Sequence, residues 1–260
     1  MFGSDMLEFL KTKNENVTGL NSAELDLTQN IQIIDDKIKD FDVVINATAF
    51  TNVNLAETEQ QKAFELNAEV PKKLSEITAA NNQKLLHIST DYVFDGTKET
   101  PYLKTDSTNP INVYGQSKLA GEKHIQDKNP NGLIIRTSWL YGPNGHCFPK
   151  AIINKLKNNQ PVEVVDDQFG TPTSTWFLRE FCHQLALTNP KETIHHGVPT
   201  GITSWHGFAT EIAKDFNKEI KPIKTTKQIA PRPKNSQLEP EKQTDKTWKQ
   251  CWDEIKTEFV

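Results

Sequence analysis

The chain has 260 residues, with 30 Lys and Arg against 34 Asp and Glu, and a sequence pI of about 6.0. This near-balanced charge argues against a nucleic-acid-binding protein, which carries a basic surplus. No apolar run approaches the roughly 18 residues of a membrane span, and the first residues lack the basic start and apolar stretch of a signal peptide. The 3 cysteines lie far apart, which indicates reduced thiols rather than disulfides or a metal site. We therefore expect a cytoplasmic protein without nucleic-acid or membrane partners.

The first segment, residues 3–10, has the apolar spacing of a helix. A dinucleotide-binding unit normally begins earlier, with a strand and a glycine-rich turn. We therefore interpret Gly3 as the last glycine of such a turn and the first strand as missing. Residues 16–21 are predicted to form a short strand, and residues 29–39 a helix. Because no acidic residue ends that strand to select NAD through the ribose, both NADPH and NADH stay open as cofactors.

Residues 41–46 form the clearest buried strand of the sequence. The residues after it are small and would let a flat ligand approach the backbone: Ala47, Thr48 and Ala49. Two helical stretches follow, at residues 53–67 and 68–81, and residues 84–90 form the next buried strand. Strands that alternate with helices in this way predict an α/β fold with a Rossmann-like, doubly wound parallel sheet, covered by helices on both faces.

A candidate proton-transfer site follows the strand that ends at Thr90. Tyr114 and Lys118 lie four residues apart in a predicted helix, so the phenol and the ammonium share one helix face. A tyrosine has an ordinary pKa of about 10, which a neighbouring cation lowers. Thr90 is placed to hydrogen-bond a carbonyl oxygen that is being protonated. A Tyr-x-x-x-Lys pair alone is a weak signal, because helix surfaces carry such pairs by chance.

The nucleotide-binding part of the chain is predicted to end near Pro143, after a buried strand at residues 133–142. We assign residues 1–143 to a dinucleotide-binding domain. Residues 144–260 form a smaller, mainly substrate-binding α/β region, from which some segments pack back on the first domain. Helices are expected there at residues 148–157, 176–187, 204–216 and 247–259.

Six sequence blocks carry a resemblance to a known family: residues 46–53, 89–96, 112–115, 136–141, 167–173 and 232–236. In this order they resemble the dTDP-4-dehydrorhamnose reductases, which are short-chain dehydrogenase/reductases of the extended kind. The Arg-Thr-Ser-Trp block and the Asp-Gln-x-Gly-x-Pro-Thr block discriminate among the extended reductases. The resemblance implies reduction of the C4 ketone of dTDP-4-dehydro-β-L-rhamnose to dTDP-L-rhamnose, in dTDP-rhamnose biosynthesis, with NADPH or NADH.

The resemblance also implies roles for individual residues. Tyr114 would donate a proton to the ketone oxygen, and Thr90 would hydrogen-bond that oxygen. Lys118 would lower the pKa of Tyr114 and bind the nicotinamide ribose. The positions implied for cofactor binding, besides Tyr114 and Lys118, are Gly3, Asp26, Leu27, Ala47, Thr48 and Ala49. The positions implied for the nucleotide-sugar substrate, besides Thr90, are Val53, Tyr92, Trp139 and Arg232.

Several alternatives stay open. Trp139 either contacts the sugar or belongs to the core, and Arg232 either clamps the substrate diphosphate or pins its loop to an acidic neighbour. The chain departs from the family in its shortened glycine turn, in Asn54 instead of aspartate and in Cys147 instead of asparagine. A non-catalytic binding or regulatory subunit, or another sugar-nucleotide epimerase or dehydratase, therefore remains an alternative function. The sequence does not fix the oligomeric state, and a homodimer stays open.

Overall fold

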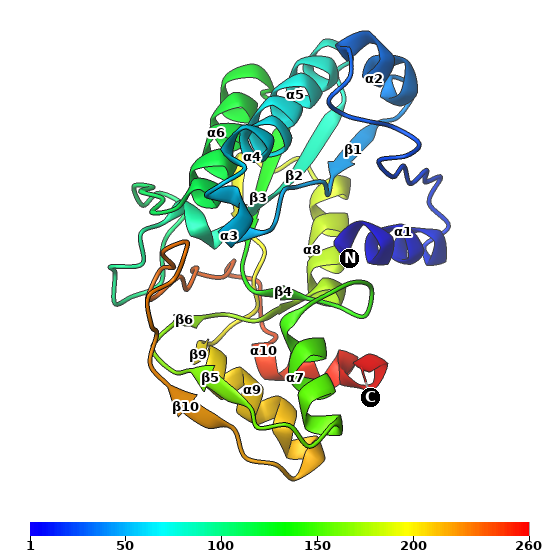
Figure 1. The fold of residues 1–260 in the computed structure, drawn as a ribbon. Helices are drawn as coiled ribbons and strands as arrows, with labels where there is room; N and C mark the ends of the chain where they lie inside the picture. Colours follow the sequence, from blue (N-terminus) through cyan, green and yellow to red (C-terminus); the bar gives the residue numbers. More distant parts are fainter. Residues whose placement is uncertain (260) are drawn as a thin grey trace.

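The computed structural model describes residues 1–259, and its centre is a four-stranded parallel sheet with strand order β1-β2-β3-β8 (Figure 1). The strands are β1 Val43–Asn46, β2 Lys84–Thr90, β3 Gly132–Thr137 and β8 Ile194–His196. Val44 pairs with Leu85, and Leu86 pairs with Leu133, so the strands run in register with their carboxyl ends at one edge. The predicted Rossmann-like α/β fold with a parallel sheet is confirmed.

Helices cover both faces of this sheet, because consecutive strand residues point to opposite sides. Leu85 and Ile134 pack in one core with α2, α5 and α6. Leu86 and Ile135 pack in a second core with α1 and α8 on the other face. The bounds of these helices are α1 Phe2–Thr12, α2 Ile31–Ile38, α5 Val70–Ala80, α6 Val113–Lys128 and α8 Thr175–Leu187. The helix α8 and the strand β8 thus belong to the sheet layers although they come late in the chain.

A third core lies below the sheet in Figure 1, around Tyr141, Phe208 and Trp252. Its helices are α7 Phe148–Lys157, α9 Trp205–Ala213 and α10 Trp248–Ile255, the last continued by η4 Lys256–Phe259, and α9 is followed by η3 Lys214–Phe216. Three short strand pairs complete it: β4 Leu140–Tyr141 with β7 Thr173–Ser174, β5 Glu163–Val165 with β10 Lys221–Ile223, and β6 Phe169–Gly170 with β9 Thr203–Ser204. Among residues 1–259, no helix is both long and apolar enough to cross a membrane.

Two local expectations are wrong. Residues 16–21 form no strand: in the described part of the chain the sheet ends at β1, and these residues do not pair with its open edge. The helix expected over residues 53–67 is broken into α3 Val53–Ala56, α4 Gln60–Phe64 and the π-helical turn η1 Glu65–Glu69. Asn67, inside that turn, bonds both backbone groups of Phe50 and the hydroxyl of Ser117. The widened turn therefore lets one side chain join the loop after β1 to α6.

Candidate active site

Thr90 lies at the carboxyl end of β2, where the chain turns into the short 3-10 helix η2 Asp91–Val93. Its backbone is still extended, and its hydroxyl accepts a hydrogen bond from the Tyr92 N–H at 3.2 Å. The same hydroxyl donates to the Asp91 carboxylate at 3.1 Å. Thr90 is thereby held at the edge of the sheet where α/β proteins bind their ligands.

The helix α6 brings Tyr114 to this edge. Asn112 caps the helix by accepting from the Gly115 N–H at 2.8 Å, and its amide donates to the Pro231 carbonyl at 2.8 Å. Gly115 allows the close approach, since an added Cβ would lie 2.1 Å from the Tyr92 carbonyl oxygen. The first turn of α6 therefore packs directly on the residues that follow Thr90.

The phenol of Tyr114 holds its proton firmly in this setting. Burial raises the pKa of Tyr114 to about 12; the hydrogen bond with Thr90 lowers it and the charge of Asp91 raises it. The ring also meets that of Tyr92 edge to face, with centroids 5.8 Å apart. The expectation that Lys118 lowers the pKa of Tyr114 is not met, because burial dominates.

Lys118 is fully buried one helical turn after Tyr114. Its Nζ donates to the Ile88 carbonyl at 2.6 Å and lies 3.0 Å from His87 Nε2. Burial lowers the pKa of Lys118 to about 8, against the opposing charge of Glu122. A lysine with a pKa in this range is neutral in an appreciable fraction near physiological pH.

Residues predicted to bind the cofactor gather around the carboxyl end of β1. Ala47 and Thr48 are exposed there, and a Cβ added to Gly3 would lie 3.4 Å from the Ala47 Cβ. The first turn of α1 therefore adjoins this strand end, and a helix N-terminus has the unpaired N–H groups and positive dipole that suit a phosphate. The open strand end, together with Lys118 at the same sheet edge, fits a nicotinamide dinucleotide.

Asp26 and Leu27 lie in the loop before α2. The Asp26 carboxylate accepts from the Thr28 N–H and hydroxyl, both at 2.8 Å, and these bonds lower its pKa. Leu27 is partly buried against the core under α2 and α5. The Asp26 carboxylate is therefore exposed, whereas the Leu27 side chain packs against the core and is only partly exposed.

The predicted substrate residues lie on several loops. Arg232 donates to the Asn54 side-chain oxygen and to the Ala230 carbonyl, each at 3.1 Å. Burial raises the pKa of Tyr92, and the charge of Arg232 opposes this rise without cancelling it. Of the two roles left open for Arg232, pinning by an acidic neighbour is not seen, because its partner Asn54 is neutral. Val53 begins α3, one residue from Asn54.

Trp139 stacks on Trp205, with ring centroids 3.6 Å apart and planes within 5°. Its backbone has a φ of 47°, an uncommon left-handed value for a bulky residue, and Gly170 packs against the ring. One ring face is therefore covered by Trp205, which the sequence reasoning did not single out. The indole of Trp139 packs on Trp205 and remains partly accessible.

Two further residues beside the site, His87 and Asn46, were not predicted from the sequence. Asn46 Nδ2 lies 3.0 Å from His87 Nδ1, and both side chains are buried. A usable signal was present in the sequence, since a histidine in the middle of a buried strand needs polar partners. In residues 1–259 no group of three or more His, Cys, Asp or Glu is arranged to hold a metal ion.

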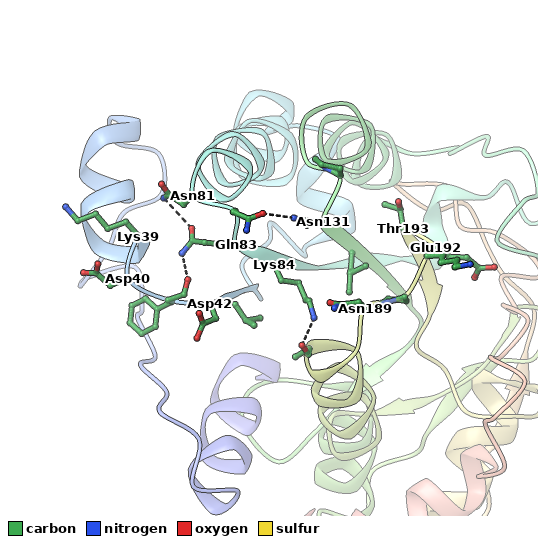
Figure 2. A pocket seen from close by; sticks show the side chains of 18 residues that line it. Lys39, Asp40, Asp42, Asn81, Gln83, Lys84, Asn131, Asn189, Glu192 and Thr193 are labelled. Atoms are coloured by element: carbon green, nitrogen blue, oxygen red, sulfur yellow. Dashed lines mark hydrogen bonds between the residues drawn. The ribbon is translucent and has the colours of Figure 1, made fainter.

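A large cavity of about 630 Å³ lies at the opposite edge of the sheet, at the amino ends of the strands (Figure 2). Lys84 donates there to the Ala186 and Thr188 carbonyls, and Gln83 donates to the Ile38 and Phe41 carbonyls. These side chains join the start of β2 to neighbouring segments. We therefore assign the cavity a structural character and place the candidate active site at the carboxyl edge.

Comparison with known proteins agrees with this geometry. The family model described as the RmlD substrate binding domain matches residues 1–258. The dTDP-4-dehydrorhamnose reductase of Salmonella typhimurium is 38% identical over 215 residues, which are 77% of this chain and 72% of that protein. The dTDP-4-keto-6-deoxy-D-glucose reductase of Streptomyces niveus is 34% identical over 80% of this chain and 73% of its own length.

Solved structures extend the likeness over the whole fold. A dTDP-4-dehydrorhamnose reductase from Bacillus anthracis in complex with NADP has a TM-score of 0.94 and 30% identity, and covers 99% of this chain and 95% of its own. The corresponding protein from Clostridium acetobutylicum has a TM-score of 0.93 and 34% identity, over 98% and 95% of the two chains. The chain therefore belongs to the RmlD family, the dTDP-4-dehydrorhamnose reductases among the NAD(P)-dependent oxidoreductases.

Proposed function

We propose that the chain reduces the C4 ketone of dTDP-4-dehydro-β-L-rhamnose to dTDP-L-rhamnose with NADPH or NADH. The observation that carries this proposal is the convergence of Thr90, Tyr114 and Lys118 at the sheet edge that also holds Ala47 and Thr48. The family supports the substrate, since the relatives from Salmonella typhimurium and Bacillus anthracis are named dTDP-4-dehydrorhamnose reductases. A cytoplasmic location and a homodimer are kept as predictions.

The reaction adds a hydride to C4 and a proton to the ketone oxygen, and the nicotinamide supplies the hydride when bound. Tyr114 supplies the proton from its hydroxyl. Its raised pKa means that the phenol is protonated throughout the physiological range and is available as a general acid. Thr90 hydrogen-bonds the same oxygen and so orients the ketone toward Tyr114.

Lys118 has one hydrogen-bonding direction left after its contacts with Ile88 and His87. We assign this direction to the nicotinamide ribose hydroxyls. Ala47, Thr48 and Ala49 would support the nicotinamide side of the dinucleotide, and Gly3, at the start of α1, its pyrophosphate. Asp26 and Leu27 would line the adenosine side.

On the substrate side, Arg232 offers a guanidinium whose side-chain partner, Asn54, is neutral. This charge suits the diphosphate of a nucleotide sugar. Tyr92 and Val53 would border the sugar, and the accessible part of Trp139 would meet its C–H surface.

The test is turnover of the purified chain with the 4-keto sugar nucleotide, followed by loss of nicotinamide absorbance with each cofactor. Tyr114→Phe should lower kcat by about 10²–10⁴-fold, the usual contribution of a positioned general acid. Lys118→Met should weaken cofactor binding as well. Lys123→Met is the matched control, since Lys123 is exposed on the same helix and should leave both quantities unchanged.

The outcomes separate the alternatives. Absence of turnover with both cofactors would contradict the proposal, and tight cofactor binding without turnover would favour a non-catalytic binding subunit. The Streptomyces niveus relative motivates a second substrate, dTDP-4-keto-6-deoxy-D-glucose, so both 4-keto sugars are compared by kcat/KM. A higher kcat/KM for the second sugar would move the proposal to that reaction.

A further inference from the structure

Trp139 has a strained backbone conformation at the point where the chain leaves the parallel sheet. Its φ of 47° lies in the left-handed region, which a bulky residue rarely adopts. The other non-glycine residues with a positive φ within residues 1–259 are all asparagines, which tolerate this region better. Such strain persists where surrounding contacts over-determine the conformation, and it is common at ligand sites. The contacts around Trp139 must therefore offset this strain.

The backbone beside Trp139 is fixed close to the candidate site. Thr90 lies opposite Thr137 in the register of β2 and β3, so the two strands end side by side. Trp139 follows the end of β3 by two residues. Between them, the Ser138 hydroxyl donates to the Thr171 carbonyl at 2.6 Å. The indole of Trp139 therefore starts from an anchored backbone at the carboxyl edge of the sheet.

The indole of Trp139 lies flat against that of Trp205, the first residue of α9. The ring centroids are 3.6 Å apart, and the planes are within 5° of parallel. Phe148 packs on the Trp205 ring with a centroid distance of 4.6 Å. Ser204 caps α9 by accepting from the Gly207 N–H at 2.9 Å. The position of Trp205 is therefore set by the third core and by the start of its helix.

Gly170 lies on the other side of the Trp139 ring. A Cβ added to Gly170 would be 2.6 Å from Cε2, 2.8 Å from Nε1 and 2.9 Å from Cζ2 of that indole. Cε2 is the nearest of the three and is bonded to the other two, so Gly170 lies over the ring and not at its edge. No backbone fits between two rings 3.6 Å apart, so Gly170 covers the face opposite Trp205. Only a glycine permits this close approach.

We propose that Trp205 is a positioning residue for the sugar of the substrate. Together with the backbone of Gly170, it clamps the Trp139 indole and fixes the part of the ring that the sugar meets. The inference rests on the proposed function, in which the accessible part of Trp139 contacts the sugar. A ring that is already held in place loses little side-chain freedom on binding, so the clamp increases affinity. Loss of the clamp should therefore raise KM and leave kcat nearly unchanged.

Trp205→Leu removes the aromatic face and keeps an apolar side chain. KM for the 4-keto sugar nucleotide should rise about two- to tenfold, the contribution expected of one aromatic contact. Trp205→Phe keeps a flat ring and should restore most of the affinity. Trp176→Leu is the matched control, because Trp176 is also partly buried against the third core but packs on Arg179, and its KM should stay at the wild-type value. An unchanged KM in a folded Trp205→Leu chain would overturn the proposal.

A double-mutant cycle tests whether Trp205 acts through Trp139. In a Trp139→Ala chain, Trp205→Leu should cause no further rise in KM, because the ring that it positions is gone. Gly170→Ala displaces the same ring from the opposite face, so it should raise KM in the wild-type chain and have no effect in Trp139→Ala. This variant keeps the cycle informative if Trp205→Leu does not fold. Equal increases in both backgrounds would overturn the proposal, since the effect would then be independent of Trp139.

An NMR measurement separates this inference from the proposed function. The full chain is labelled with ¹⁵N-tryptophan, and the Trp139 indole resonance is assigned with Trp139→Phe. Trp205→Leu should move this resonance, because the ring current of the stacked indole is lost, and Trp176→Leu should not; a resonance that stays in place would overturn the clamp. If the resonance moves but no 4-keto sugar is reduced, only the reductase proposal fails. If the sugar is reduced but Trp205→Leu has the wild-type KM, only the positioning role fails.

Discussion

The buried ion pair between Glu122 and Arg136 fastens the helix that carries Tyr114 to the sheet. Arg136 Nη2 lies 2.7 Å from the Glu122 carboxylate, with side-chain exposures of 3% and 0%. Ser89, next to Thr90, donates to the same carboxylate at 2.5 Å. Arg136→Met would leave the Glu122 charge buried without its partner, so we expect a loss of about 3–5 kcal/mol in the free energy of unfolding. In a chain of this size that is a fall in Tm of roughly 6–20 °C.

The assay is urea unfolding followed by circular dichroism, with linear extrapolation to water. The double variant Arg136→Met with Glu122→Leu removes both charges and should be less destabilised than the sum of the two single changes. The control is the Lys221–Glu163 pair, which has the same 2.7 Å separation but exposures of 70% and 50%. Lys221→Met should cost less than about 1 kcal/mol. A loss for Arg136→Met as small as that of Lys221→Met would refute the reasoning.

Two further predictions concern charge at the site. Asp91 has a pKa raised from 3.8 to about 7 by burial, so its contribution to stability is present at acid pH and is lost as the pH rises through about 7. Asp91→Asn should therefore gain about 3 kcal/mol relative to wild type between pH 5 and pH 8 in urea unfolding; a constant difference contradicts this. Asn54→Asp would place a carboxylate against Arg232 and should raise KM for the nucleotide sugar up to about fivefold at unchanged kcat, given the small energy of exposed pairs. An unchanged KM would show that Arg232 does not bind the diphosphate.

Local patterns predicted much of the fold. The apolar strands β1, β2 and β3 and the helix α7 form where the sequence indicates, and α7 has the predicted bounds. The failed strand at residues 16–21 shows the limit of such patterns, because a strand requires a paired neighbour as well as suitable residues. The π-helical turn η1 depends on bonds from Asn67 to residues far along the chain, which no local pattern contains.

The site shows the same division between local and non-local information. The sequence spacing placed Tyr114 and Lys118 one helical turn apart, and the helix has this geometry. The pKa of Tyr114 was expected to fall and instead rises, since burial is a property of the packed molecule. The contact of Lys118 with His87, 31 residues earlier, and the stack of Trp139 on Trp205 likewise exist only after folding.

The central claim is that a hydride reaches C4 of a 4-keto sugar nucleotide while Tyr114 protonates the oxygen. The most direct measurement is a reaction of the chain with a nicotinamide cofactor that carries deuterium at the transferable position, analysed by NMR of the sugar product. The account predicts a single deuterium at C4 of the product, formed by the wild-type chain and lost with Tyr114→Phe. A product without deuterium at C4, or exchange only at neighbouring carbons, would contradict it and would indicate an epimerase or dehydratase instead.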